Sequence, residues 1–161
     1  MPERVRIRNR QRRLSIDPRP VRRLLEAVLA GEGVAPGRPL EVALLRDGAL
    51  AEMNARFRGR PGPTDVLSFP ADPRGWPPEE PRPLGEIVVS VDRACEQAAA
   101  RGLAPARELE RLLVHGALHL TGYDDHTPAE RARMRRREER YLRLARGRQA
   151  PGARRARGRE G

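Results

Sequence analysis

All three histidines of this chain lie within the twelve residues HGALHLTGYDDH, at positions 115, 119 and 126. His115 and His119 are four residues apart, so on an α-helix they lie about 40° apart on one face. An adjacent stripe of the same helix consists of small and apolar residues that would pack against a sheet, Leu109, Leu113, Gly116 and Leu120. Gly122 would let the chain turn back after the helix. The pattern therefore predicts a helix and a turn that bring His126 to the other two imidazoles.

This clustering predicts a metal centre. Imidazole nitrogen is a good ligand for Zn²⁺, and three protein ligands leave the fourth tetrahedral position open for water, as in catalytic zinc sites. Water bound to such a zinc ion has its pKa lowered to about 7. The alternative is that His115 and His119 are ordinary helix histidines with core neighbours. The third histidine and the glycine turn argue against that alternative.

The residue after the first histidine limits the chemistry. Zinc peptidases carry the helical pattern HExxH, in which the glutamate is the general base. Here Gly116 follows His115, so that base is missing and peptide hydrolysis of this type is disfavoured. A phosphodiester substrate needs an activated nucleophile and charge stabilisation, and a bound metal can supply much of both.

Short apolar runs separated by turn signals predict one domain of helices and strands over residues 1–145. Strand-like runs are expected within residues 5–14, 40–45, 66–69 and 85–91. Helical patterns begin at the expected caps Asp17, Asp47, Asp92 and Thr127, and at Pro105. The proline-rich segment 70–83 is expected to form a surface loop. Residues 146–161 contain six arginines without apolar periodicity, and we expect them to be a disordered tail.

The charge of the chain favours a polyanionic partner. All 33 basic residues are arginine, against 22 acidic residues, which gives a net charge of +11. Nucleic acid is the first expectation for such a partner and a membrane surface the second. The basic helix expected after Thr127 either binds an RNA backbone or is a solvated face. The second reading is equally open because Glu130, Glu138 and Glu139 partly compensate its arginines.

The cellular location is predicted from what the sequence lacks. One cysteine, Cys95, excludes an internal disulfide framework. The charged N-terminus shows no signal peptide, and the apolar runs fall short of the roughly 18–20 residues that span a bilayer. We therefore expect a soluble, cytoplasmic protein that does not bind a membrane.

Three motifs together resemble those of the bacterial YbeY family. They are HGALHLTGYDDH, PTDVLSFP at Pro63–Pro70 and LGEIVVSVDRA at Leu84–Ala94, and the similarity runs in order from about Leu40 to Leu144. The resemblance implies an α+β domain whose small mixed four-stranded sheet packs against helices. It also implies a zinc-dependent, single-strand-specific endoribonuclease that acts in 16S rRNA 3′-end maturation and ribosome quality control. RNA and ribosomal particles are then the expected partners.

The chain departs from the family pattern at the third histidine. The family places it ten positions after the first, where this chain has Asp125, and His126 follows one position later. A turn absorbs one extra residue easily, so we predict His126 as the third ligand and keep Asp125 as the alternative. Asp124 or Asp125 could instead orient a ligand imidazole. Arg58 matches a family position associated with activity, where a guanidinium would hold a phosphate.

The sequence thus predicts a zinc-dependent endoribonuclease with His115, His119 and His126 as metal ligands and Arg58 as a catalytic residue. Two other functions remain open at this point. The first is a non-catalytic ribosome-assembly factor in which zinc only holds the last helices to the sheet. The second is a zinc peptidase or small-molecule hydrolase.

Overall fold

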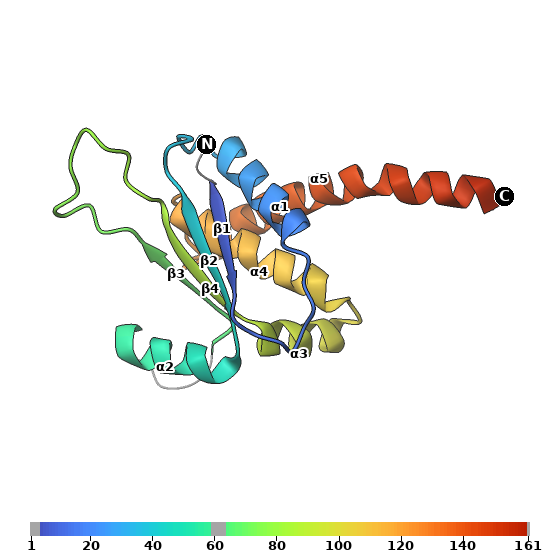
Figure 1. Cartoon of the computed structure of the whole chain (residues 1–161), viewed down its shortest axis with the longest axis horizontal. Coiled ribbons are helices and arrows are strands. Elements are labelled where there is room, and N and C mark those ends of the chain that lie inside the picture. Colours follow the sequence, from blue (N-terminus) through green and yellow to red (C-terminus); the bar gives the residue numbers. More distant parts are fainter. Residues whose placement is uncertain (1–3, 59–63, 161) are drawn as a thin grey trace.

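The computed structural model describes residues 4–58 and 64–160 and shows one α+β domain (Figure 1). Its strands are β1 (Val5–Asn9), β2 (Leu40–Leu45), β3 (Val66–Pro70) and β4 (Gly85–Ser90). Its helices are α1 (Pro18–Gly31), α2 (Asp47–Arg58), α3 (Val91–Arg101), α4 (Pro105–Leu120) and α5 (Pro128–Glu160). The predicted fold class, a small mixed four-stranded sheet packed against helices, is confirmed.

The four strands form one mixed sheet in the order β1-β2-β4-β3. β2 pairs in parallel with both β1 and β4, whereas β3 pairs antiparallel to β4, with Val66 opposite Val89. β4 is the most buried strand because it lies inside the sheet and both its faces are covered. β3 is an edge strand, so its side chains can border a cleft. The proline-rich segment 71–84 is the long loop that joins β3 to β4 (Figure 1).

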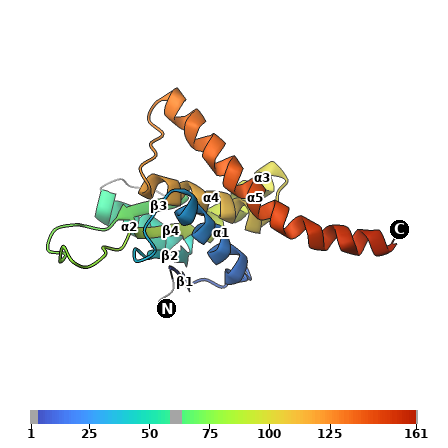
Figure 2. The ribbon, with the colours of Figure 1, turned by 90° about the horizontal axis from the view of Figure 1, so that it is seen from above.

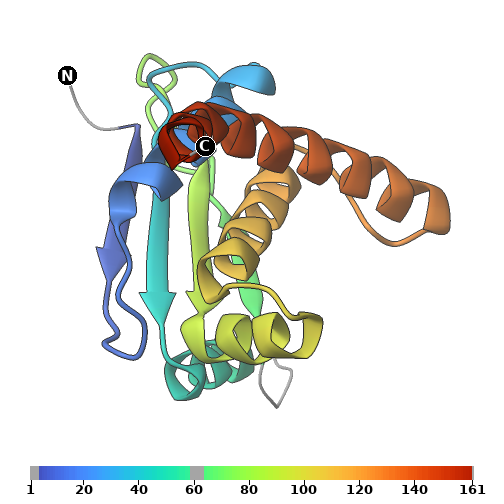
Figure 3. The same ribbon diagram turned by 90° about the vertical axis from the view of Figure 1, so that its right-hand side faces the viewer.

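Most helices cover one face of the sheet, as Figure 3 shows. α1 and α4 pack there, and α5 crosses above them to complete the main core (Figures 2 and 3). The opposite face carries a smaller apolar cluster, in which Leu50 of α2 contacts Ala43, Leu67 and Val88. α4 therefore lies directly on the sheet beside β3 and β4, and this position decides where its histidines can point.

Capping residues set where the helices begin. Asp17 caps α1 as predicted, because its carboxylate accepts a hydrogen bond from the backbone N–H of Arg19 and Pro18 follows at the first helical position. The cap of α3 differs from the prediction. Ser90, not Asp92, accepts the hydrogen bond from the N–H of Arg93. Asp92 lies in the first turn of α3, where its carboxylate has other partners.

The Asp92 carboxylate joins the loop after β1, the end of β2 and the start of α3. Arg46 donates to both carboxylate oxygens at 2.9 and 3.0 Å, and Arg13 donates at 2.7 Å. The backbone N–H of Asp47 donates at 2.7 Å. Burial raises the pKa of the Asp92 carboxyl, but the hydrogen bonds from Arg46 and Arg13 outweigh burial and hold that pKa well below its usual range.

We expect Asp92→Asn to lower the free energy of unfolding by about 2 kcal/mol at neutral pH, because charge-assisted hydrogen bonds are lost. The Asp92 pKa is lower in the folded than in the unfolded chain, so its stabilisation is present above about pH 3.9 and disappears as the pH falls toward the folded pKa. Urea denaturation over a pH series measures this. The wild type and the variant should converge in acid, and a pH-independent difference would contradict the prediction.

α5 is the longest helix and runs through the boundary that the sequence suggested at residue 145. It spans Pro128–Glu160, and its last turns project away from the sheet (Figures 1 and 2). The division into a domain over residues 1–145 and a disordered tail over 146–161 stays a prediction. None of the helices in the described part of the chain combines the length and the apolar character needed to cross a bilayer.

Candidate metal centre

α4 and the turn after it carry the candidate site. His115 and His119 lie one turn apart on α4, both half-buried, at the border between the core and the solvent. The predicted neighbouring stripe does face the sheet, since Leu109, Leu113 and Gly116 are buried. α4 ends at Leu120, and Gly122 follows with a φ of 110°, a left-handed conformation that glycine adopts without strain.

Three ligand atoms converge at this point. The Nε2 atoms of His115 and His119 are 3.1 Å apart. Oδ2 of Asp125 lies 3.5 Å from Nε2 of His119 and 3.7 Å from Nε2 of His115. Two ligands about 2.0 Å from a tetrahedral Zn²⁺ ion lie about 3.3 Å apart, so these separations fit a single ion. The three residues form a group that could hold a metal.

Hydrogen bonds at Nδ1 of each histidine ring leave the other ring nitrogen, Nε2, to face Asp125 and the second histidine. Nδ1 of His119 is 3.0 Å from the backbone oxygen of Tyr123, and Nδ1 of His115 is 3.3 Å from Oε1 of Glu138. A carbonyl oxygen and a carboxylate can only accept, so each Nδ1 carries the proton. Both Nε2 lone pairs then point toward each other and toward Asp125. Electron-rich atoms gathered in this way are stabilised by a cation between them.

The structure brings Asp125, rather than the predicted His126, to the two histidines. The side chain of His126 is 80% exposed, and its Nε2 lies 3.9 Å from Oδ1 of Asp124. Asp125 is the residue ten positions after His115, and the turn ending at His126 directs its carboxylate inward. His126 lines the same cleft as the group. Its role as a ligand stays a prediction.

Arg58, the predicted catalytic residue, is the last residue of α2. Its side chain lies outside the part of the chain that the structure describes. Its predicted role in holding a phosphate therefore stays a prediction.

His115, His119 and Asp125 line an open, polar cleft of about 650 Å³. Val66, Ser68 and Pro70 of the edge strand β3 line the same cleft. Asp65 lies just before this strand, and its carboxylate accepts hydrogen bonds from the N–H of Val66 and from the side chain of Gln97.

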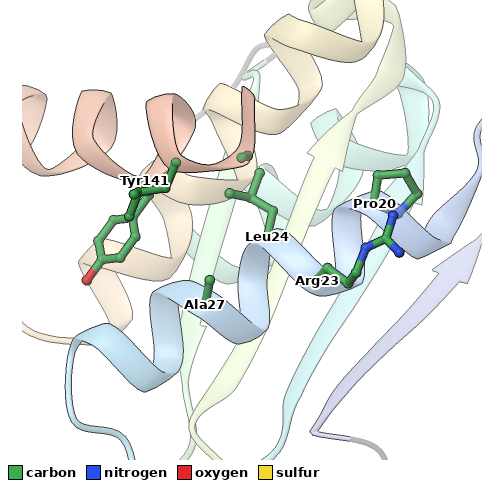
Figure 4. Close-up of a pocket in the computed structure, with 7 residues that line it drawn as sticks. Pro20, Arg23, Leu24, Ala27 and Tyr141 are labelled. Atoms are coloured by element: carbon green, nitrogen blue, oxygen red, sulfur yellow. The ribbon is translucent and has the colours of Figure 1, made fainter. Parts of the chain in front are cut away.

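A second hollow, of about 270 Å³, lies between α1 and α5 (Figure 4). Leu24, Ala27 and Pro20 give it a mostly apolar lining, with Arg23 and Tyr141 at its borders (Figure 4). None of its lining residues belongs to the histidine group. The cleft beside β3 is therefore the candidate functional site.

Two contacts to the histidines were not anticipated from the sequence. The sequence predicts that Glu138 compensates the arginines of its helix, but the side chain is buried and contacts His115. Its spacing offered a signal, because Met134, Glu138 and Tyr141 recur at the period of one buried helix face. The second contact, from His119 to the carbonyl of Tyr123, is made by the backbone and has no signature in a side-chain pattern.

Gly116 shows why the zinc peptidase pattern is absent. A Cβ atom at this position would lie 2.9 Å from Cγ2 of Ile87 on β4 and 3.1 Å from Oγ of Ser68 on β3. The sheet therefore fills the space that any side chain would need. A glutamate here could not act as a general base without displacing α4 from the sheet.

We expect Gly116→Ala to destabilise the fold by about 1–3 kcal/mol, because overpacking outweighs the better helix propensity of alanine. Gly48, near the start of α2, is the matched control, since a Cβ atom there meets nothing within 4 Å. Gly48→Ala should stabilise the protein by up to about 1 kcal/mol. Thermal and urea denaturation of both variants measure the difference. Stabilisation by both substitutions would contradict the close approach of α4 to the sheet.

The sequence and the structure of the chain are similar to those of known proteins. A family model described as Endoribonuclease YbeY matches residues 6–146. An endoribonuclease YbeY of Chloroflexus aurantiacus is 45% identical over 134 residues, covering 80% of this chain and 87% of the relative. One from Moorella thermoacetica is 44% identical over 128 residues, covering 74% and 81%. The solution structure of TM1509 from Thermotoga maritima aligns with a TM-score of 0.65 at 26% identity, covering 92% and 93% of the two chains.

Proposed function

The chain belongs to the YbeY family of endoribonucleases, and from that membership we propose that it cleaves single-stranded RNA at the metal centre on α4. The relatives are named endoribonucleases, so the family is one of RNA-cleaving hydrolases. The observation that carries the proposal is the convergence of His115, His119 and Asp125 at one wall of an open polar cleft. The proposed metal is zinc.

Each residue of the centre has a defined part in this proposal. Nε2 of His115, Nε2 of His119 and a carboxylate oxygen of Asp125 would hold the ion. A zinc ion bound there would supply an activated water or a polarised scissile phosphate. Glu138 and the carbonyl of Tyr123 hold the two imidazoles in the orientation that binding requires. The guanidinium of Arg58 would neutralise charge that develops on the phosphate.

The proposed substrate is ribosomal RNA, and the proposed setting is the cytoplasm. We expect the chain to act in maturation of the 3′ end of 16S rRNA and in ribosome quality control, with ribosomal particles as partners. The net charge of +11 supports a polyanionic substrate. Membership of the family supports RNA over other polyanions.

The experiment is a cleavage assay on three substrates. Purified chain is incubated with single-stranded RNA, double-stranded RNA or casein, with added zinc or with a chelator. The proposal predicts cleavage of single-stranded RNA only, and only with metal. Intact RNA with degraded casein would favour a peptidase. A folded, metal-binding chain that cleaves neither would favour the non-catalytic assembly factor with a structural zinc.

The third ligand is tested by metal analysis of two variants. We expect Asp125→Ala to lower zinc affinity about 10–100-fold or more, because an inward-facing ligand is lost. His126→Ala should keep zinc, because the His126 side chain is 80% exposed and is not among the three residues whose ligand atoms converge. Competition with a chromophoric chelator measures both affinities. Loss of zinc only in His126→Ala would make His126 the third ligand instead.

A further inference from the structure

A hollow lined by arginines is linked to the metal centre through Tyr123. Its lining residues are Tyr123, Arg133, Arg136, Arg137 and Arg140, and its volume is about 400 Å³. Four of the five lie on α5 at positions i, i+3, i+4 and i+7, so they share one face of that helix. We refer to these five residues as the arginine hollow.

Tyr123 belongs to both the metal centre and the arginine hollow. Its backbone oxygen is 3.0 Å from Nδ1 of His119. Its ring lies 5.4 Å from the guanidinium carbon of Arg133, and its hydroxyl accepts a hydrogen bond of 2.9 Å from Nε of Arg137. One residue thus joins a ligand of the proposed metal to the arginines. A smaller hollow that includes Asp124 and Glu130 lies between the cleft and the arginines, so a polymer strand that leaves the cleft past Tyr123 crosses it before it reaches the arginine hollow.

The arginines of the hollow differ in how fully they are already paired. Arg137 is half-buried and forms an ion pair of 3.2 Å with Glu32, which also accepts a hydrogen bond from Tyr141. Arg136 and Arg140 are exposed, and neither forms an ion pair with another residue that the structure describes. Arg137 therefore has a structural role in the arginine hollow. The guanidinium groups of Arg136 and Arg140 have donors that can bind a ligand.

The acidic residues of α5 do not neutralise this face. Glu130 forms a capping box, in which its carboxylate accepts from the N–H of Thr127 and the Thr127 hydroxyl accepts from the N–H of Glu130. Glu138 is buried against His115. Glu139 is exposed and lies about 60° around the helix from Arg136 and about 100° from Arg140, and no ion pair joins it to either residue in the described part of the chain. Two of the three carboxylates that could pair with the arginines thus have other partners, Glu130 the backbone of Thr127 and Glu138 the ring of His115.

Resting on the proposed function, we propose that the arginine hollow binds backbone phosphates of the single-stranded RNA that leaves the metal cleft. A guanidinium presents paired donors that match two phosphate oxygens, and it keeps its charge at any physiological pH. Arg136 and Arg140 make these contacts, while Arg133 is held ready by its stacking on Tyr123. Bound in this way, the strand is anchored beside the centre that cuts it.

The test is the salt dependence of RNA binding by the full chain without metal, so that no cleavage occurs. Fluorescence anisotropy of a labelled single-stranded RNA is measured between about 50 and 200 mM salt. The double variant Arg136→Gln, Arg140→Gln should bind more weakly, and its log–log salt slope should fall by about 1.4, or about 0.7 for each phosphate lost.

The matched control removes the same charge elsewhere. Arg135 is exposed on α5 but lies about 140° around the helix from Arg140, and Arg6 is exposed on the far edge strand β1. The double variant Arg6→Gln, Arg135→Gln should keep the wild-type slope. Circular dichroism confirms that both double variants are folded.

Three results would overturn the proposal. The first is an equal fall of the log–log salt slope in both double variants. The second is wild-type RNA binding by the double variant Arg136→Gln, Arg140→Gln. The third is competition for the labelled RNA by polyglutamate that is as effective as competition by unlabelled RNA. The last result would assign the hollow to an acidic protein surface. Failure of the proposed function is a separate outcome. In that case metal-loaded wild type leaves RNA intact, although the slopes still differ as expected.

Discussion

We expect His119→Ala to remove nearly all of the proposed RNA cleavage while the chain remains folded. The substitution removes one of three ligand atoms, and a bound metal supplies several kcal/mol of charge stabilisation in phosphoryl chemistry. Each 1.36 kcal/mol corresponds to a factor of ten in rate, so the cleavage rate should fall about 10³-fold or more. Zinc affinity should fall in parallel, because the two remaining ligand atoms bind the ion more weakly.

The fold should survive His119→Ala for local reasons. Alanine is the best helix former, and the His119 side chain is only half-buried at the border of the core. Gel-based cleavage, zinc content and circular dichroism are measured on the same preparation. A variant that lacks zinc and still cuts RNA at the wild-type rate would refute a catalytic role for the metal.

Glu138→Ala should lower the affinity of the proposed site for zinc about 10–100-fold, although Glu138 is not one of the three proposed ligands. Its carboxylate holds the proton of His115 on Nδ1 and so presents Nε2 to the ion. Without Glu138 the imidazole can change tautomer or rotate. Glu138→Gln should recover part of the affinity, because the amide oxygen can still accept from Nδ1.

The neighbouring Glu139 provides the control for this prediction. Glu139 is exposed on the same helix, so Glu139→Ala removes an equal charge without touching His115. Zinc affinity from chelator competition is compared across the three variants, together with thermal denaturation. Wild-type affinity in Glu138→Ala, or equal losses in Glu138→Ala and Glu139→Ala, would contradict the positioning role of Glu138.

The sequence predicted the elements whose residues repeat with a regular period. The stripe of Leu109, Leu113 and Gly116 predicted the buried face of α4, and hence the side on which His115 and His119 lie. The mixed sheet came from the resemblance to a family, since periodicity identifies strands and not their order. The cap of α3 was misplaced because Asp92 forms ion pairs with residues distant in the sequence.

The identity of the third ligand depends on the backbone geometry of the turn after α4, which the hydrophobic periodicity of the sequence does not predict. The turn after α4 is fixed by the left-handed Gly122 and by the hydrogen bond from the N–H of Tyr123 to the oxygen of Leu118. Arg131 then donates to the backbone oxygens of Asp125 and His126. These backbone contacts decide which side chain of the turn faces the histidines. Counting residues from His115 could only leave Asp125 and His126 as alternatives.

A zinc titration of the metal-free chain tests the central claim most directly. Bound zinc and the cleavage rate of single-stranded RNA are measured at each addition. Three ligands around one ion predict that cleavage rises with bound zinc and reaches its plateau at about one ion per chain. Cleavage at full rate before zinc is added, or a plateau in binding without cleavage, would contradict the account.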